Sequence, residues 1–139
     1  MEKYVHKVQY YETDRMGISH HSNYVRWMEE ARVYFLNRNN CGYYEIEKLG
    51  FSSPVLGIEC NYKRTTTFED EVEIEVKMSE YNSVKMAYEY IMRNKATGEL
   101  VFTGKSSHCF INNEGRPINL KKYMPEIDEK LYKLVNNIC

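Results

Sequence analysis

The residues best suited to chemistry lie in one short stretch, residues 11–24, which reads YETDRMGISHHSNY. Asp14 follows an expected strand, a loop containing Gly17 comes next, and an expected helix then begins. The start of a helix presents backbone N–H groups without partners and the positive end of the helix dipole, and these can hold a developing oxyanion. A nearby carboxylate can attack a carbonyl group or activate water. This stretch therefore contains both parts of an acyl-transfer site.

Hydrophobic periodicity predicts the elements that position this stretch. Residues 3–12 alternate imperfectly between apolar and polar, which predicts a first strand. From residue 22 the spacing becomes that of one helical face, with Ser22 or Asn23 as the cap and Cys41-Gly42 as the end. The apolar face of this helix comprises Tyr24, Trp27, Met28, Ala31, Tyr34 and Phe35.

Four strand-like segments follow a short helical stretch at 43–49. They cover residues 55–65, 71–78, 84–93 and 99–111, and short turns between the last three predict antiparallel pairing. Glu71, Glu73 and Glu75 alternate with apolar residues and should form the solvated face of a strand. A terminal helix is expected at about 125–137. Residues 1–139 thus predict one α+β domain. Its single long helix can cover only one face of the sheet, which leaves the other face or an edge exposed. We therefore expect self-association.

Composition excludes several classes of function. The 19 basic and 20 acidic residues give a net charge of -1, and there is no basic block of the kind that binds nucleic acid. No segment is apolar enough for a membrane span or a signal peptide, so we expect a cytoplasmic protein. The four cysteines, at positions 41, 60, 109 and 139, show no CxxC spacing, which predicts reduced thiols without a disulfide framework or a zinc site.

The motif as a whole resembles a known family. The pattern Y-x-E-T-D-x-M-G-x-x-x-H-x-N-Y, continuing into W-M-E-E-A-R, resembles the 4-hydroxybenzoyl-CoA thioesterase branch of the hot-dog superfamily, and most of all its small bacterial acyl-CoA thioesterases. The matching residues are Asp14, Gly17, His21, Asn23, Tyr24, Glu30, Ala31 and Arg32. The resemblance extends to residues 62–65, 69–70, 97–98, 104–111 and 115–117, and so covers residues 3–120.

The resemblance implies a hot-dog fold, an antiparallel sheet wrapped around one long central helix. It implies that Asp14 is the catalytic carboxylate and that the backbone amide of His21 polarises the thioester carbonyl. It also implies hydrolysis of an acyl-CoA to a free acid and CoA without a metal or organic cofactor, at an active site on the interface of a homodimer or homotetramer. The substrate-binding residues that we assign are Gly17, His20, Asn23, Tyr24, Lys63 and Arg64.

Simpler interpretations compete for several of these residues. Tyr24 lies on the apolar helical face, where core packing is the more common role. His20 and His21 are adjacent and point in different directions, so a metal site is not expected, and the family usually has an aromatic residue at position 20. Lys63 and Arg64 suit CoA phosphates but equally suit a solvated strand end. No G-x-S-x-G motif supports a serine hydrolase.

Two other functions remain open at this stage. A hot-dog hydratase or dehydratase needs a histidine and a carboxylate for proton transfer at the acyl chain. A non-catalytic acyl-CoA-binding module could use the same pocket, although it would not need Asp14 near the thioester. The sequence leaves open the acyl group, the choice between CoA and acyl carrier protein, dimer against tetramer, and whether Asp14 acts as nucleophile or as general base.

Overall fold

The structure is a computed structural model that describes residues 3–136. Its strands are β1 (Tyr4–Lys7), β2 (Val55–Tyr62), β3 (Glu71–Tyr81), β4 (Lys85–Asn94) and β5 (Leu100–Cys109). Its helices are α1 (Asn23–Arg38), α2 (Tyr43–Lys48), α3 (Leu120–Tyr123) and α4 (Pro125–Val135), with one turn of 3-10 helix, η1 (Tyr10–Glu12). The expected order of elements is confirmed, apart from the short α3 that the periodicity did not predict.

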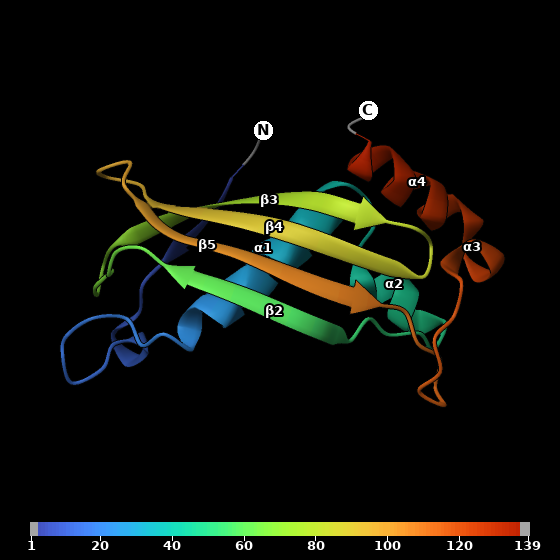
Figure 1. Ribbon diagram of the computed structural model, residues 1–139, viewed down its shortest axis with the longest axis horizontal. Helices are drawn as coiled ribbons and strands as arrows, with labels where there is room; N and C mark the ends of the chain where they lie inside the picture. The colour runs from blue at the N-terminus through green and yellow to red at the C-terminus, as the bar shows by residue number, and fades with distance from the viewer. Residues whose placement is uncertain (1–2, 137–139) are drawn as a thin grey trace.

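The five strands form one antiparallel sheet with the order β1-β3-β4-β5-β2. The two short turns connect β3 to β4 and β4 to β5, as predicted. Strand β2 does not pair with β3, which follows it in the chain. It crosses to the far edge and pairs with β5, with Ile58 opposite Ser106 and Tyr62 opposite Phe102. Helix α1 runs behind the sheet, obliquely to the strands (Figure 1).

The two faces of the sheet differ in chemistry because strand residues alternate. On the α1 side, every second residue of β3 from Val72 to Met78 is buried. These side chains pack against α1 residues Trp27, Met28 and Ala31 in the main core. On the opposite face, Glu73 and Glu75 are only half-buried and lie near the Lys3 ammonium group, at 3.9 and 3.6 Å. The glutamates of β3 therefore form the solvated face, as predicted.

The first strand is shorter than predicted. Pairing with β3 ends at Lys7, and residues 10–12 turn into η1 instead of extending the strand. The physical cause is Glu12, whose carboxylate accepts a hydrogen bond of 2.8 Å from the Gln9 amide and so closes a turn. Glu12 is 5% exposed, whereas Tyr10 and Tyr11 beside it are exposed. A buried acid at the end of an alternating pattern could not be distinguished from a strand residue by periodicity alone.

Both ends of α1 differ from the prediction in detail. Ser22 stands at the cap position but its side chain makes no capping bond, and Asn23 is already the first helical residue. At the other end the helix stops at Arg38, because Asn40 adopts a left-handed conformation with φ 59° and the Cys41 amide bonds back to the Leu36 carbonyl at 2.8 Å. Asparagine tolerates that conformation, so no glycine is needed there. Gly42 instead precedes α2 as its cap.

The C-terminal helix α4 packs on the sheet mainly through Ile127 and Leu131. Asp128, also buried, accepts hydrogen bonds from the hydroxyls of Tyr81 at 2.5 Å and Ser83 at 2.6 Å. These contacts attach α4 to the end of β3, where Figure 1 shows it beside the sheet. Residue 137, the expected end of the terminal helix, lies outside the described residues.

A chain of buried polar groups crosses the core under the middle of the sheet. The Arg32 guanidinium donates to the Tyr90 hydroxyl at 2.9 Å, Tyr90 contacts Ser106 at 2.7 Å, and Ser106 contacts His108 Nε2 at 2.8 Å. His108 is fully buried, as a structural residue would be, and its Nδ1 has no hydrogen-bond partner among the residues described. Burial first, and then repulsion from Arg32, lower the pKa of His108 from 6.5 to about 4.

This lowered pKa predicts acid sensitivity. As pH falls below 6.5, the unfolded chain binds a proton at His108 that the folded protein does not accept until about pH 4. The difference should cost the folded state about 3 kcal/mol over that interval. His108→Gln retains polar atoms but does not titrate, so its free energy of unfolding should fall less between pH 6.5 and about 4. Urea unfolding of both proteins across this interval measures the difference, and parallel curves would contradict the assignment.

Candidate active site

The loop that carries Asp14 is a tight turn between two short segments. Thr13 and Ser19 form an antiparallel bridge, and the Asp14 amide donates to the Ile18 carbonyl at 2.9 Å. The Gly17 amide bonds back to the Asp14 carbonyl at 2.9 Å, and the positive φ of Gly17, +79°, lets the chain after this turn return beside Asp14. The half-buried Asp14 carboxylate accepts one hydrogen bond through Oδ1, from the Met16 amide at 2.8 Å. Its second oxygen makes no hydrogen bond to the residues described, so it is available for chemistry.

The start of α1 leaves one backbone donor unused. The His20 amide donates to the Glu12 carbonyl at 2.8 Å, and the Asn23 amide donates to the His20 carbonyl at 3.0 Å. The Ser22 amide donates to Nδ1 of His20 at 3.2 Å, so the imidazole performs the capping that Ser22 was expected to perform. Between these three, the His21 amide has no acceptor among residues 3–136. An unpaired N–H at the N-terminus of a helix of 16 residues is a site for developing negative charge.

Tyr62 lies against this helix start from the end of β2. Its hydroxyl donates to the His21 carbonyl at 3.1 Å, and its ring meets the edges of Tyr24 and Phe102, each at a centroid distance of 5.3 Å. Desolvation first, and then Cys60 and Tyr24, raise the pKa of Tyr62 to about 12, so the hydroxyl remains a donor. Sequence reasoning did not select Tyr62 as a site residue. The available signal was an aromatic residue directly before the Lys63-Arg64 pair.

The crossover from β2 to β3 holds the Asp14 loop in place. The Thr66 carbonyl accepts from the Ser19 amide at 2.8 Å, and the Thr66 hydroxyl contacts the hydroxyls of Ser19 at 2.7 Å and Tyr24 at 3.0 Å. The Thr67 hydroxyl donates to the Gly17 carbonyl at 2.8 Å. Thr66 is 2% exposed, which makes it a structural link and not a surface residue. Nothing in the run of three threonines at 65–67 distinguished it in sequence.

Not all the expected substrate-binding residues have side chains that are free to bind substrate. Asn23 and Tyr24 are buried, and their polar atoms are bonded to the Glu12 carbonyl and to Thr66. For Tyr24 these contacts favour the core-packing interpretation. Gly17, His20 and His21 are exposed, with the two imidazole rings tilted against each other at a centroid distance of 4.3 Å.

The two basic candidates lie just beyond Tyr62. Lys63 is exposed and takes part in no ion pair with another described residue, whereas Arg64 pairs with Glu99 through a contact of 2.7 Å. Both extend from the end of β2 that contacts the start of α1. No hydrogen bond joins Asp14 to His20 or His21 in the part of the chain described. The loop and the helix start are instead neighbours that share Glu12 and Thr66 as common supports.

Between residues 3 and 136, no group of three or more His, Cys, Asp or Glu residues could hold a metal ion. The three cysteines described, Cys41, Cys60 and Cys109, are free thiols. No helix in this part of the chain is both long and apolar enough to cross a membrane.

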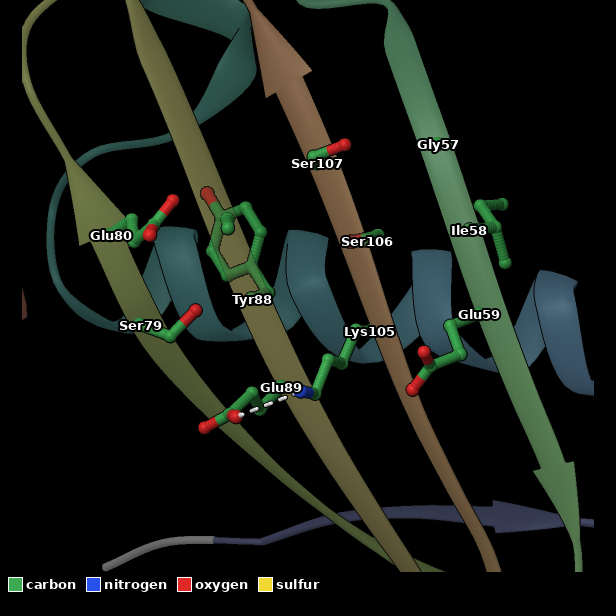
Figure 2. A pocket seen from close by; sticks show the side chains of 11 residues that line it. Gly57, Ile58, Glu59, Ser79, Glu80, Tyr88, Glu89, Lys105, Ser106 and Ser107 are labelled. Carbon is green, nitrogen blue, oxygen red and sulfur yellow. Dashed lines mark ion pairs between the residues drawn. The ribbon is translucent and has the colours of Figure 1, made fainter.

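A depression lies on the face of the sheet opposite α1. It has a volume of about 480 Å³, and Figure 2 shows Glu59, Glu89 and Lys105 around it with α1 on the far side of the strands. Lys105 and Glu89 form an ion pair of 3.9 Å across β4 and β5. The depression is lined by neither Asp14 nor His21. It is therefore separate from the candidate active site.

The fold and this site define a class. A five-stranded antiparallel sheet around one long central helix is the hot-dog fold of thioesterase structures, and the chain belongs to the thioesterase-like superfamily, whose family model matches residues 8–133. The predicted fold and family are thereby confirmed.

Similar proteins support the same class. A Bacillus subtilis (strain 168) protein named "Putative acyl-CoA thioesterase YneP" is 36% identical over 121 residues, covering 86% of this chain and 87% of that protein. The crystal structure of a DHNA-CoA thioesterase from Staphylococcus aureus is 31% identical with a TM-score of 0.92, covering 97% of this chain and 92% of that chain. A 1,4-dihydroxy-2-naphthoyl-CoA thioesterase from Synechocystis, 14% identical with a TM-score of 0.84, covers 98% of this chain and 96% of its own and shares the fold.

Proposed function

We propose that this protein is an acyl-CoA thioesterase that hydrolyses a thioester to a carboxylic acid and CoA, with Asp14 as its catalytic carboxylate. The observation that carries the proposal is the His21 amide at the start of α1, which has no acceptor among residues 3–136 and lies beside the loop that fixes Asp14. In this mechanism the thioester oxygen accepts from that amide, and the helix dipole stabilises the oxyanion as it forms. Asp14 either attacks the carbonyl carbon and expels CoA thiolate, leaving an anhydride that water then hydrolyses, or takes a proton from a water that attacks the carbonyl carbon and expels CoA thiolate.

We further propose that the acyl group is aromatic. The Staphylococcus aureus relative, 31% identical, is named as a DHNA-CoA thioesterase. In this chain the aromatic rings of Tyr24, Tyr62 and Phe102 gather beside the His21 backbone, and Tyr62 remains 48% exposed. Tyr62, the exposed ring of the three, suits a planar aryl group, and the buried rings of Tyr24 and Phe102 support it from behind. Lys63, and Arg64 after release from Glu99, would meet the CoA phosphates.

We also propose that the active unit is a homodimer that pairs through β2. Strand β2 is the edge of the sheet beyond β5, and its exposed side chains include Val55, Leu56, Ile58 and Tyr62. A long apolar edge strand with unpaired backbone groups is a template for pairing with another chain. The sheet's face opposite α1 and its β2 edge are the two surfaces that α1 does not cover. The face is polar, so the apolar edge is the surface that favours contact with a second copy. Pairing here would bring the partner next to Tyr62 and the start of α1.

The role of Asp14 is tested by Asp14→Asn, which keeps the shape of the side chain and removes the nucleophile and base. We expect kcat to fall about a hundredfold or more with little change in KM, because general-base loss has at least this effect. The measurement is thiol release from a panel of aryl-, short-chain and medium-chain acyl-CoAs. Asp70→Asn is the matched control, since its oxygen can still accept from the Thr67 amide. Wild-type binding of acyl-CoA without turnover would instead support a non-catalytic module.

The role of the His21 backbone is tested by comparing two substitutions. His21→Ala keeps the amide and should retain most activity, whereas His21→Pro deletes the N–H and should lower kcat by about 10²–10³-fold. His21 directly precedes the cap residue Ser22, and its amide makes no hydrogen bond within the described residues, so proline there should leave the fold intact. Circular dichroism and oligomer size of both variants provide the control. If the alanine variant is as inactive as a folded proline variant, the imidazole and not the amide is the catalytic group.

The β2 interface is tested by light scattering of wild-type protein and of Ile58→Lys. We expect wild type to be at least a dimer of the 16.6 kDa chain at micromolar concentration. Lysine at the apolar edge should weaken association by roughly tenfold or more, because it places an unpaired charge in the interface. Asn61→Lys adds the same charge to the opposite face of the strand and should have a smaller effect. A wild-type monomer, or equal effects of the two lysines, would contradict pairing through β2.

A further inference from the structure

The carboxylate of Glu12 is buried in the wall between the Asp14 loop and α1. It is 5% exposed and accepts three hydrogen bonds of 2.8 Å each, from the Gln9 amide, from His6 Nε2 and from the indole N–H of Trp27. Burial alone would raise the pKa of Glu12, yet these hydrogen bonds hold it below its usual range. The side chain is therefore an ionised carboxylate with a full set of donors around it.

The backbone of the same residue supports the start of α1. The Glu12 carbonyl accepts from the His20 amide at 2.8 Å and from Nδ2 of Asn23 at 2.8 Å. Residue 20 directly precedes the free amide of His21, and Glu12 itself lies two positions before Asp14. One residue thus contacts both segments that carry the proposed chemistry.

A second carboxylate holds the outer side of this arrangement. Nδ1 of His6 lies 3.0 Å from the carboxylate of Glu30 on α1, while its Nε2 faces Glu12. Burial raises the pKa of Glu30 against the opposing effect of His6, so of the two carboxylates Glu30 takes up a proton more readily. The His6 ring also lies on Trp27 at a centroid distance of 4.7 Å. The group formed by Glu12, His6, Trp27 and Glu30 joins β1, η1 and α1.

From this geometry we infer that Glu12 is the positioning residue of the active site, setting the Asp14 carboxylate and the His21 amide at a fixed separation. The inference rests on the proposed thioesterase function. A carboxylate is needed because three donors converge on two oxygens. Glutamine would offer a single acceptor oxygen and direct an NH₂ group at other donors. A displacement of about 1 Å in a catalytic pair can cost about a hundredfold in rate.

The test is Glu12→Gln, with Glu29→Gln on the exposed side of α1 as the matched control. We expect the Glu12 variant to lose about tenfold to a hundredfold in kcat with KM nearly unchanged, and the control to match wild type. In an Asp14→Asn background, Glu12→Gln should cause a smaller further loss than in wild type, because the part of its effect that acts through Asp14 is already gone and only the His21 amide is left to be displaced. Losses that multiply in the double variant would overturn the inference.

A second readout does not depend on turnover. Amide hydrogen exchange at His20, whose N–H donates to the Glu12 carbonyl, should accelerate in Glu12→Gln and remain unchanged in Glu29→Gln. Unchanged exchange at His20 would overturn the positioning role even if the protein is an active thioesterase. An inactive wild type with accelerated exchange in the variant would instead refute the proposed function while supporting the role of Glu12 in holding the helix start.

If Glu12→Gln fails to fold, Asn23→Ala provides the same test with a smaller change. It removes the side-chain amide that donates to the Glu12 carbonyl, and it leaves the Glu12 carboxylate with its three donors. We expect a several-fold loss of kcat that is again smaller in the Asp14→Asn background. A folded Asn23→Ala protein with wild-type kcat and wild-type exchange at His20 would contradict the inference.

Discussion

The packing of α1 against β5 is the constraint on which the rest of the structure depends. A Cβ atom at Gly104 would lie 2.8 Å from the Met28 sulfur and 2.7 Å from the Phe102 ring, so any larger residue would force these side chains to shift. On the preceding turn of the helix Tyr24 stacks on Phe102 at 5.1 Å. Because the helix is rigid, these two contacts determine where its N-terminus lies, and hence the position of the His21 amide relative to the end of β2.

Two buried polar groups then fix the rotation of the helix about its axis. Near its start, Trp27 and the partly exposed Glu30 bond to the Glu12 and His6 pair, while Arg32, the fifth residue after Trp27, bonds to Tyr90 on β4. Apolar contacts alone tolerate small rotations, whereas a buried donor displaced from its acceptor costs about 1–3 kcal/mol. Both groups use residues of the W-M-E-E-A-R segment. That segment therefore fixes the orientation of α1, the helix whose N-terminus carries the candidate site.

The elements of this fold could be predicted from sequence wherever a local period decides them. The 3.6-residue period of α1 and the alternation of β3 located residues such as Trp27 and Val72, both buried. Placement of β2 could not be predicted, because its register with β5 depends on contacts across forty or more residues of sequence. The same holds for Thr66 and Glu12, whose importance lies entirely in their partners. His20 acts as a helix cap that only the three-dimensional structure reveals.

The same contacts explain why one chain leaves the candidate site exposed to water. His21 is exposed, the Asp14 carboxylate is only half-buried, and the apolar side chains of the β2 edge continue from Tyr62 without cover. An N–H donor stabilises an oxyanion most where water is excluded, because the local dielectric constant is then low. The chain supplies the charges, the dipole and a rigid support for them, but no lid of its own among the described residues. A second copy on the β2 edge would exclude water from the surface where Tyr62 meets His21, so assembly and catalysis would depend on the same strand.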